Sequence, residues 1–160
     1  MDRGLIIGAT GLLGRALADT TGAVRGAREA SEQEGWVQVD LDRPSELGEI
    51  LAQCEPDWVV NTAAITSVDA CEANPEAARR IHVDAVKALA EACGARGVRL
   101  FQLSTNYVFD GKGGPYGEAD ATNPLNVYGA TKLEGERVAL AACEATILRT
   151  AVFYGFDPTA

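Results

Sequence analysis

Tyr128 and Lys132 lie four residues apart, and together their side chains can supply a proton and a positive charge. Positions i and i+4 share one face of a helix, so both side chains would enter the same site. A phenol has an ordinary pKa of about 10, which a neighbouring cation lowers. Such a tyrosine can donate a proton to an oxygen atom that receives a hydride. The Tyr-x-x-x-Lys pattern therefore predicts proton donation by Tyr128, assisted by Lys132.

Three glycines with regular spacing lie near the start of the chain, between an apolar run and a helical pattern. Glycines permit a tight turn in which backbone N–H groups and the positive end of a helix approach a pyrophosphate. A plain strand-to-helix turn is the alternative, but the position at the opening of a βα unit favours a dinucleotide. The residues expected to bind it here are Gly8, Thr10, Gly11, Leu12, Leu13 and Gly14.

Thr105 follows an apolar run that ends at Leu103, so it should lie at the end of a strand. The carboxyl ends of strands in a parallel sheet face the ligand crevice. A hydroxyl there can hold a substrate carbonyl while Tyr128 protonates it, or it can simply cap the next turn. The presence of Tyr128 favours the catalytic interpretation.

Short apolar runs alternate with helical patterns along the chain, which is typical of βαβ units. Strands are expected near 5–7, 23–24, 36–39, 58–60, 98–103 and 147–148, and helices near 12–17, 44–54, 74–94 and 127–143. No repeat or linker interrupts this pattern. The sequence predicts the α/β class, a doubly wound parallel sheet of the Rossmann fold with strand order 3-2-1-4-5-6, and one NAD(P)-binding domain over residues 1–160.

Composition narrows the function classes further. A net charge of -9 argues against nucleic acid as a partner, because no basic face is available. Four cysteines without a CxxC pair and a single histidine make a metal site unexpected and suggest reduced thiols in a cytoplasmic protein. The apolar N-terminus resembles a secretory signal, but Asp2 and Arg15 oppose that interpretation. No apolar run approaches the roughly 18 residues of a membrane span.

Two segments carry a family resemblance: STNYVFDGKGGPYGEADATNPLNVYGATKLEGE at 104–136 and NTAAITSVDACE at 61–72. They resemble the dTDP-4-dehydrorhamnose reductase family of extended short-chain dehydrogenases/reductases, and the likeness extends from Leu5 to Gly155. It implies an NAD(P)-dependent oxidoreductase that transfers a hydride to the 4-keto group of a dTDP-6-deoxyhexose, in dTDP-L-rhamnose synthesis. It also implies a dTDP-sugar as partner and a possible homodimer.

The resemblance implies roles for individual residues. Thr105 would bind the C4 carbonyl, Tyr128 would donate the proton, and Lys132 would tune Tyr128 and hold the nicotinamide ribose. Further residues expected along the cofactor are Asn61, Ala63 and Ala64, with Asp40 and Leu41. Those expected to bind the substrate are Val68, Asp69, Thr105, Asn106 and Tyr107.

The end of the second predicted strand bears on the choice of cofactor. Folds that bind NAD usually carry an acid there for the ribose 2′-OH, whereas this chain has Arg25 and Arg28. Arginines suit a 2′-phosphate, which favours NADPH over NADH. Solvated loop charges are the alternative, and Glu29 lies nearby.

Three features depart from the family pattern. Asn106 replaces an aspartate, and His82 replaces a helix asparagine, where it could relay protons or fill space. The family is about twice this length, and its substrate lobe would begin after Phe156. Two alternatives therefore stay open: an NADP-binding regulatory subunit like the β subunit of methionine adenosyltransferase, or a dinucleotide-binding fragment without turnover. The intact set of Thr105, Tyr128 and Lys132 favours an enzyme.

Overall fold

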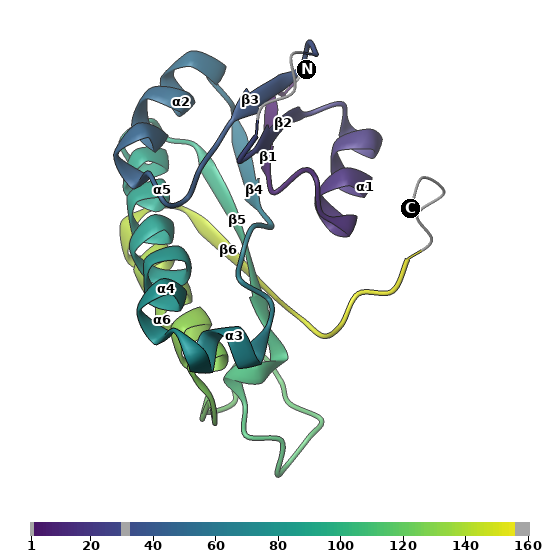
Figure 1. Ribbon diagram of the computed structural model, residues 1–160, viewed down its shortest axis with the longest axis vertical. Coiled ribbons are helices and arrows are strands. Elements are labelled where there is room, and N and C mark those ends of the chain that lie inside the picture. The colour runs from purple at the N-terminus through teal and green to yellow at the C-terminus, as the bar shows by residue number, and fades with distance from the viewer. Residues whose placement is uncertain (1, 30–32, 156–160) are drawn as a thin grey trace.

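A computed structural model describes residues 2–29 and 33–155, and these residues form a six-stranded sheet with helices on both faces (Figure 1). The strand order is β3-β2-β1-β4-β5-β6 and every neighbouring pair is parallel, which confirms the predicted Rossmann topology. The strands are β1 Gly4–Ile7, β2 Val24–Ala27, β3 Trp36–Gln38, β4 Trp58–Asn61, β5 Arg99–Thr105 and β6 Ala145–Thr150. The expected start of a substrate lobe, after Phe156, lies outside the described residues.

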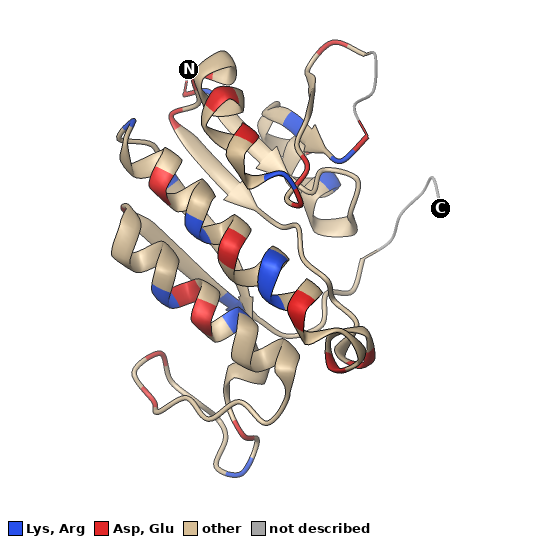
Figure 2. Cartoon of the chain, turned by 60° about the vertical axis from the view of Figure 1, so that its left-hand side comes forward, with Lys and Arg blue, Asp and Glu red and all other residues tan. Residues whose placement is uncertain are grey.

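The helices cover the two faces of the sheet unequally. They are α1 Leu12–Thr21, η1 Pro44–Glu46, α2 Leu47–Cys54, α3 Val68–Ala73, α4 Pro75–Arg79, η2 Arg80–Asp84, α5 Ala85–Gly94, η3 Asn106–Val108 and α6 Val127–Ala142. Helices α2, α4, α5 and α6 form a layer on one face, and α1 lies on the other (Figure 1). Charged residues mark the outer surfaces of the helical layer, while the strands behind it carry few (Figure 2).

The main core lies between the sheet and this helical layer. Leu5, Val59 and Leu100 come from three adjacent strands and are fully buried, as is Leu89 of α5. Strand β1 is buried at every position, as expected for a parallel strand that is covered on both faces. This packing fixes the carboxyl ends of β1, β4 and β5 side by side.

The helical segment after β4 is more broken than the sequence predicted. A separate helix, α3, is capped at its start by Ser67, whose hydroxyl accepts a hydrogen bond from the Ala70 N–H at 3.2 Å. Asn74 caps α4 as expected, accepting from the Ala77 N–H at 3.0 Å. The helix predicted over 74–94 is present as α4, η2 and α5 in direct succession, and the unexpected feature is the π turn at η2, in which the Ala85 N–H bonds the Arg80 carbonyl. Across the described ranges, no helix is long and apolar enough to cross a membrane.

Candidate active site

The glycine turn between β1 and α1 brings backbone atoms very close together. Gly8 has a φ of +85°, in the left-handed region that favours glycine. A Cβ at Gly14 would lie 2.2 Å from the Gly8 carbonyl oxygen, whereas a Cβ at Gly11 would meet only that oxygen, at 3.4 Å. Gly11 is also the N-cap of the ten-residue α1. The turn therefore presents bare backbone and a helix N-terminus to the space beside Gly11, a cradle that suits a diphosphate.

Two cavities flank this turn. The larger, about 460 Å³, extends from the turn to α6, and the smaller, about 180 Å³, lies on the β2 side. Predicted residues that line the larger cavity are Gly11, Leu12, Leu13, Gly14, Ala64, Val68, Thr105, Asn106, Tyr107, Tyr128 and Lys132. Those that line the smaller are Gly8, Thr10, Arg28, Leu41, Ala63 and Ala64. An elongated ligand that crosses the turn would thus contact most of the predicted residues.

Helix α6 places Tyr128 at the larger cavity. The Asn126 side chain caps the helix by accepting from the Gly129 N–H at 2.7 Å, and the Glu72 carboxylate accepts from the Val127 N–H at 2.7 Å. The Tyr128 ring contacts two other rings edge-on, with centroids 5.7 Å from His82 and 5.6 Å from Tyr107. These contacts fix the orientation of the phenol.

The pKa shifts of Tyr128 and Lys132 differ from what the sequence predicted. Burial raises the pKa of Tyr128 above its ordinary value, and a hydrogen bond with Thr105 only partly opposes this. The expected lowering of that pKa by Lys132 is therefore wrong for this arrangement. The Lys132 ammonium donates to the Leu103 carbonyl at 2.6 Å, and burial lowers its pKa to about 8, against the opposing effect of Glu136. At neutral pH the phenol holds its proton and the ammonium is charged.

Four predicted residues line neither cavity. Arg25 forms an ion pair with Asp19 and lies over the Trp36 ring at 5.7 Å, while Asp69 is exposed. Asn61 is fully buried, and its side-chain oxygen accepts a hydrogen bond from the backbone N–H of Ala63, a residue of the smaller cavity, at 3.1 Å. The fourth, Asp40, lies near the smaller cavity and approaches Arg28 at 3.5 Å.

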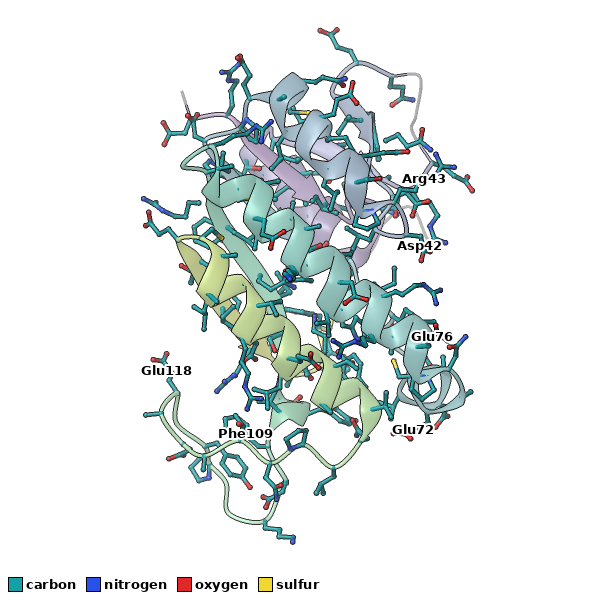
Figure 3. The ribbon with its side chains drawn as sticks, turned by 90° about the vertical axis from the view of Figure 1, so that its left-hand side faces the viewer. Asp42, Arg43, Glu72, Glu76, Phe109 and Glu118 are labelled. Carbon is teal, nitrogen blue, oxygen red and sulfur yellow. The ribbon has the colours of Figure 1, made fainter. Side chains whose placement is uncertain are left out.

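Arg28 reaches the rim of the smaller cavity. Its guanidinium bonds Asp42 at 3.1 Å and two-thirds of its side chain is exposed. Figure 3 labels Asp42 and the neighbouring Arg43. Among the described residues, no group of three or more His, Cys, Asp or Glu side chains is placed so that it could hold a metal ion.

A family model described as the RmlD substrate binding domain matches residues 2–159. The chain belongs to this family. A curated relative, the dTDP-4-dehydrorhamnose reductase of Streptomyces griseus, is 42% identical over 96% of the chain and 50% of its own length. Methionine adenosyltransferase 2 subunit beta of Bos taurus is also 42% identical, over 96% of the chain and 47% of its own. The predicted resemblance is thereby confirmed.

A solved structure agrees with the fold of this RmlD-family chain. The dTDP-4-dehydrorhamnose reductase of Bacillus anthracis, solved in complex with NADP, matches with a TM-score of 0.79 and 27% identity. The match covers 94% of this chain and 53% of the other. The chain spans about half the length of the curated relatives it matches.

Sequence reasoning missed a buried ion pair behind the site of this RmlD-family chain. Glu136 accepts bonds from the Arg149 guanidinium at 2.7 and 3.0 Å and from the Ser104 hydroxyl. Glu136 is almost fully buried, and Ser104 precedes Thr105 on β5. The spacing held a signal, because Glu136 lies four residues after Lys132 and so shares its helix face. The pair ties β6 to α6 and stabilises the strand end that carries Thr105.

Proposed function

We propose that this chain is the cofactor-binding and proton-donating part of a reductase that transfers a hydride from NAD(P)H to the 4-keto group of a dTDP-6-deoxyhexose. The observation that carries the proposal is the meeting of Thr105, Tyr128 and Lys132 at a cavity that begins at the glycine turn. The turn suits a diphosphate, since Gly8 and Gly14 pack against neighbouring backbone at distances that only glycine allows and the N-terminus of α1 faces the space beside Gly11. The reductase of Streptomyces griseus supports the substrate class.

Individual residues of this chain would have separate roles in the reduction. NAD(P)H, when bound, supplies the hydride. The Tyr128 phenol, whose raised pKa keeps it protonated, donates a proton to the oxygen of the ketone. The Thr105 hydroxyl, which lines the same cavity and accepts a hydrogen bond from the Tyr107 N–H at 3.2 Å, orients the same oxygen. The buried Lys132 ammonium holds ribose hydroxyls and, once the phenol loses its proton, stabilises the phenolate.

The cofactor is proposed to be NADPH rather than NADH. Arg28 lines the smaller cavity, on the β2 side of the turn, where a 2′-phosphate would lie. The NADP-bound reductase of Bacillus anthracis supports this choice. The sugar nucleotide would enter the larger cavity beside Val68, Asn106 and Tyr107.

A single-turnover experiment with the chain in excess over NADPH tests the proposal. With a dTDP-4-keto-6-deoxyhexose, we expect NADPH oxidation that is slow, roughly 100-fold or more below that of a full-length reductase. Binding energy from remote parts of a substrate normally orients the reacting centre, and this chain spans only half of its relatives. Tyr128→Phe should reduce the rate by a further factor of about 100. Oxidation that does not depend on Tyr128 would contradict the assignment of the proton donor.

A second candidate function rests on the equal similarity to methionine adenosyltransferase 2 subunit beta. In that case the chain would bind NADP and act by association with another protein. Tight NADPH binding without Tyr128-dependent oxidation, for any of a panel of nucleotide 4-keto-sugars, would favour this second function.

A further inference from the structure

His82 is a buried histidine whose two ring nitrogens are both engaged. Nε2 accepts a hydrogen bond from the Ile65 backbone N–H at 3.0 Å. Nδ1 lies 2.9 Å from the Thr131 hydroxyl oxygen. The ring thus connects two segments, the one after β4 that lines both cavities and the helix that carries Tyr128 and Lys132.

These partners permit only one neutral tautomer. Because a backbone N–H can only donate, Nε2 must carry a lone pair, and the ring proton of the neutral histidine lies on Nδ1. The Thr131 hydroxyl donates its own proton to the carbonyl of Val127 at 2.8 Å or of Tyr128 at 3.1 Å. The Thr131 oxygen can therefore accept a hydrogen bond from Nδ1–H. The Ile65 N–H, the His82 Nδ1–H and the Thr131 hydroxyl then each have an acceptor.

The backbone around His82 is arranged to bring the ring this close to α6. A Cβ at Gly135 would lie 2.2 Å from the His82 carbonyl oxygen, so α6 packs against η2 at a distance that only glycine allows. His82 also lies inside the π turn of η2, and π turns occur often at functional sites. Close packing and the widened turn together place the imidazole between Ile65 and Thr131.

We propose that His82 is a positioning residue that fixes segment 62–66 against the Tyr128–Lys132 face of α6 through one neutral tautomer. The functional part of this inference rests on the proposed cofactor site, since residues of that segment and of that helix face both line the larger cavity. His82 does not relay protons, because its lone pair and its N–H are both used in holding the backbone and the helix. The histidine thus acts as a two-sided hydrogen-bonded bridge.

The tautomer can be measured directly, because His82 is the single histidine of the chain. Nitrogen NMR of the wild-type chain with ¹⁵N-labelled histidine should give one pair of ring signals at pH 7. We expect a protonated Nδ1, an unprotonated Nε2 and a slowly exchanging Ile65 amide. A proton on Nε2, or a ring that averages between tautomers, would overturn the proposal. This measurement needs no cofactor, so it stands whether or not the proposed function does.

A matched pair of variants tests the effect on the cavity. Thr131→Val removes the acceptor for Nδ1–H and keeps the side-chain volume, whereas Thr131→Ser keeps the hydroxyl. Calorimetry should show NADPH binding about three- to tenfold weaker in Thr131→Val and unchanged in Thr131→Ser. Equal affinity in the two variants would overturn the positioning role. Should Thr131→Val fail to fold, the tautomer and the Ile65 exchange rate still decide. Failure of the wild type to bind NADPH would instead count against the proposed function.

Discussion

At the scale of single residues, burial rather than charge pairing controls the proposed proton donor and its neighbour. Burial raises the pKa of the Tyr128 phenol and lowers that of the Lys132 ammonium to about 8. Both shifts favour the neutral form of the group, as expected when a side chain leaves water. A phenol that keeps its proton until a substrate oxygen develops negative charge is suited to act as a general acid.

Arg25 in β2 and Arg28 directly after it should differ in their effect on cofactor binding. We expect Arg28→Ala to weaken NADPH binding about tenfold and to leave NADH nearly unchanged, because Arg28 lines the smaller cavity. Arg25→Ala should change neither affinity, since Arg25 is engaged with Asp19 and Trp36. Calorimetry with both cofactors checks this. Equal losses of NADPH and NADH affinity on replacing Arg28 would contradict a contact between Arg28 and the 2′-phosphate.

His82 should make the stability of the chain depend on pH. Burial, helped by the Lys132 ammonium, lowers the pKa of His82 from 6.5 to about 4, with Lys132 and the Tyr128 phenol facing it from α6. Since the folded pKa is the lower one, the contribution of neutral His82 is complete above about pH 6.5 and is lost as the pH falls toward 4. That contribution should be about 1–3 kcal/mol.

Urea unfolding of the wild type and of His82→Phe between pH 7 and pH 4.5 measures this contribution. The difference in unfolding free energy between the two proteins should shrink as the pH falls. A difference that stays constant over this range would mean that His82 does not titrate between the folded and unfolded states.

The meeting of Thr105, Tyr128 and Lys132 at one cavity could be predicted because it depends on local spacing. The i, i+4 relation put Tyr128 and Lys132 on one face, and the strand end brought Thr105 to them. The partners of Arg25 and His82 could not be predicted. They lie on other elements, Asp19 on α1 and Thr131 on α6, and no local pattern specifies which elements meet.

At the scale of elements, α6 is the scaffold of the site. Its first turn is held by Asn126 and Glu72, and its middle is held against β6 by the Glu136–Arg149 pair. Figure 3 shows Glu72 on α3 near the start of α6, and Phe109 and Glu118 on the loop at its other side. A helix fixed at several points can hold two side chains at a constant distance from β5.

The close packing of α6 gives a prediction about stability. Gly135→Ala should destabilise the chain by about 1–3 kcal/mol, because the new Cβ would lie 2.2 Å from the His82 carbonyl oxygen. Gly48→Ala is the matched control, since nothing lies within 4 Å of a Cβ at Gly48 in α2. It should instead stabilise by about 0.5–1 kcal/mol through helix propensity. If denaturant unfolding showed that the free energy of unfolding changes in the same direction in both variants, the packing argument would be contradicted.

Most elements followed from the sequence, and the exceptions have physical reasons. The six strands were predicted because apolar runs in a parallel sheet are short and continuous. Helix α3 was missed because its six residues are too short to show helical periodicity. The π turn at 80–84 was missed because it depends on the packing of α6 against η2 rather than on local propensity.

At the scale of the whole molecule, the face of the sheet that carries α1 is only partly covered (Figure 1). A groove of about 460 Å³ lies there, lined mainly by apolar side chains that include Leu13, Trp58, Phe101 and Leu148. Large exposed apolar patches promote association between proteins. The helical face, in contrast, is rich in charge (Figure 2).

This groove predicts that the chain self-associates at high concentration. Sedimentation velocity should show a concentration-dependent increase in mass, and Leu148→Lys, at a position 40% exposed in the native chain, should reduce it. Leu140→Lys is a matched control, because Leu140 is exposed on α6, away from the groove. If the two variants reduced self-association equally, the contact between copies would not involve the groove.

The glycine turn should bind NAD(P)H so that the nicotinamide end of the cofactor reaches Tyr128 and Lys132. The dissociation constant of NADPH for Gly11→Val, relative to the wild type, tests this most directly. Gly11 is suitable because a Cβ there meets only the Gly8 carbonyl oxygen, at 3.4 Å, so the variant should fold while its branched side chain occupies the place of the diphosphate. We predict an affinity at least about tenfold lower, or about 1.4 kcal/mol. An unchanged affinity in a folded Gly11→Val chain would contradict the claim.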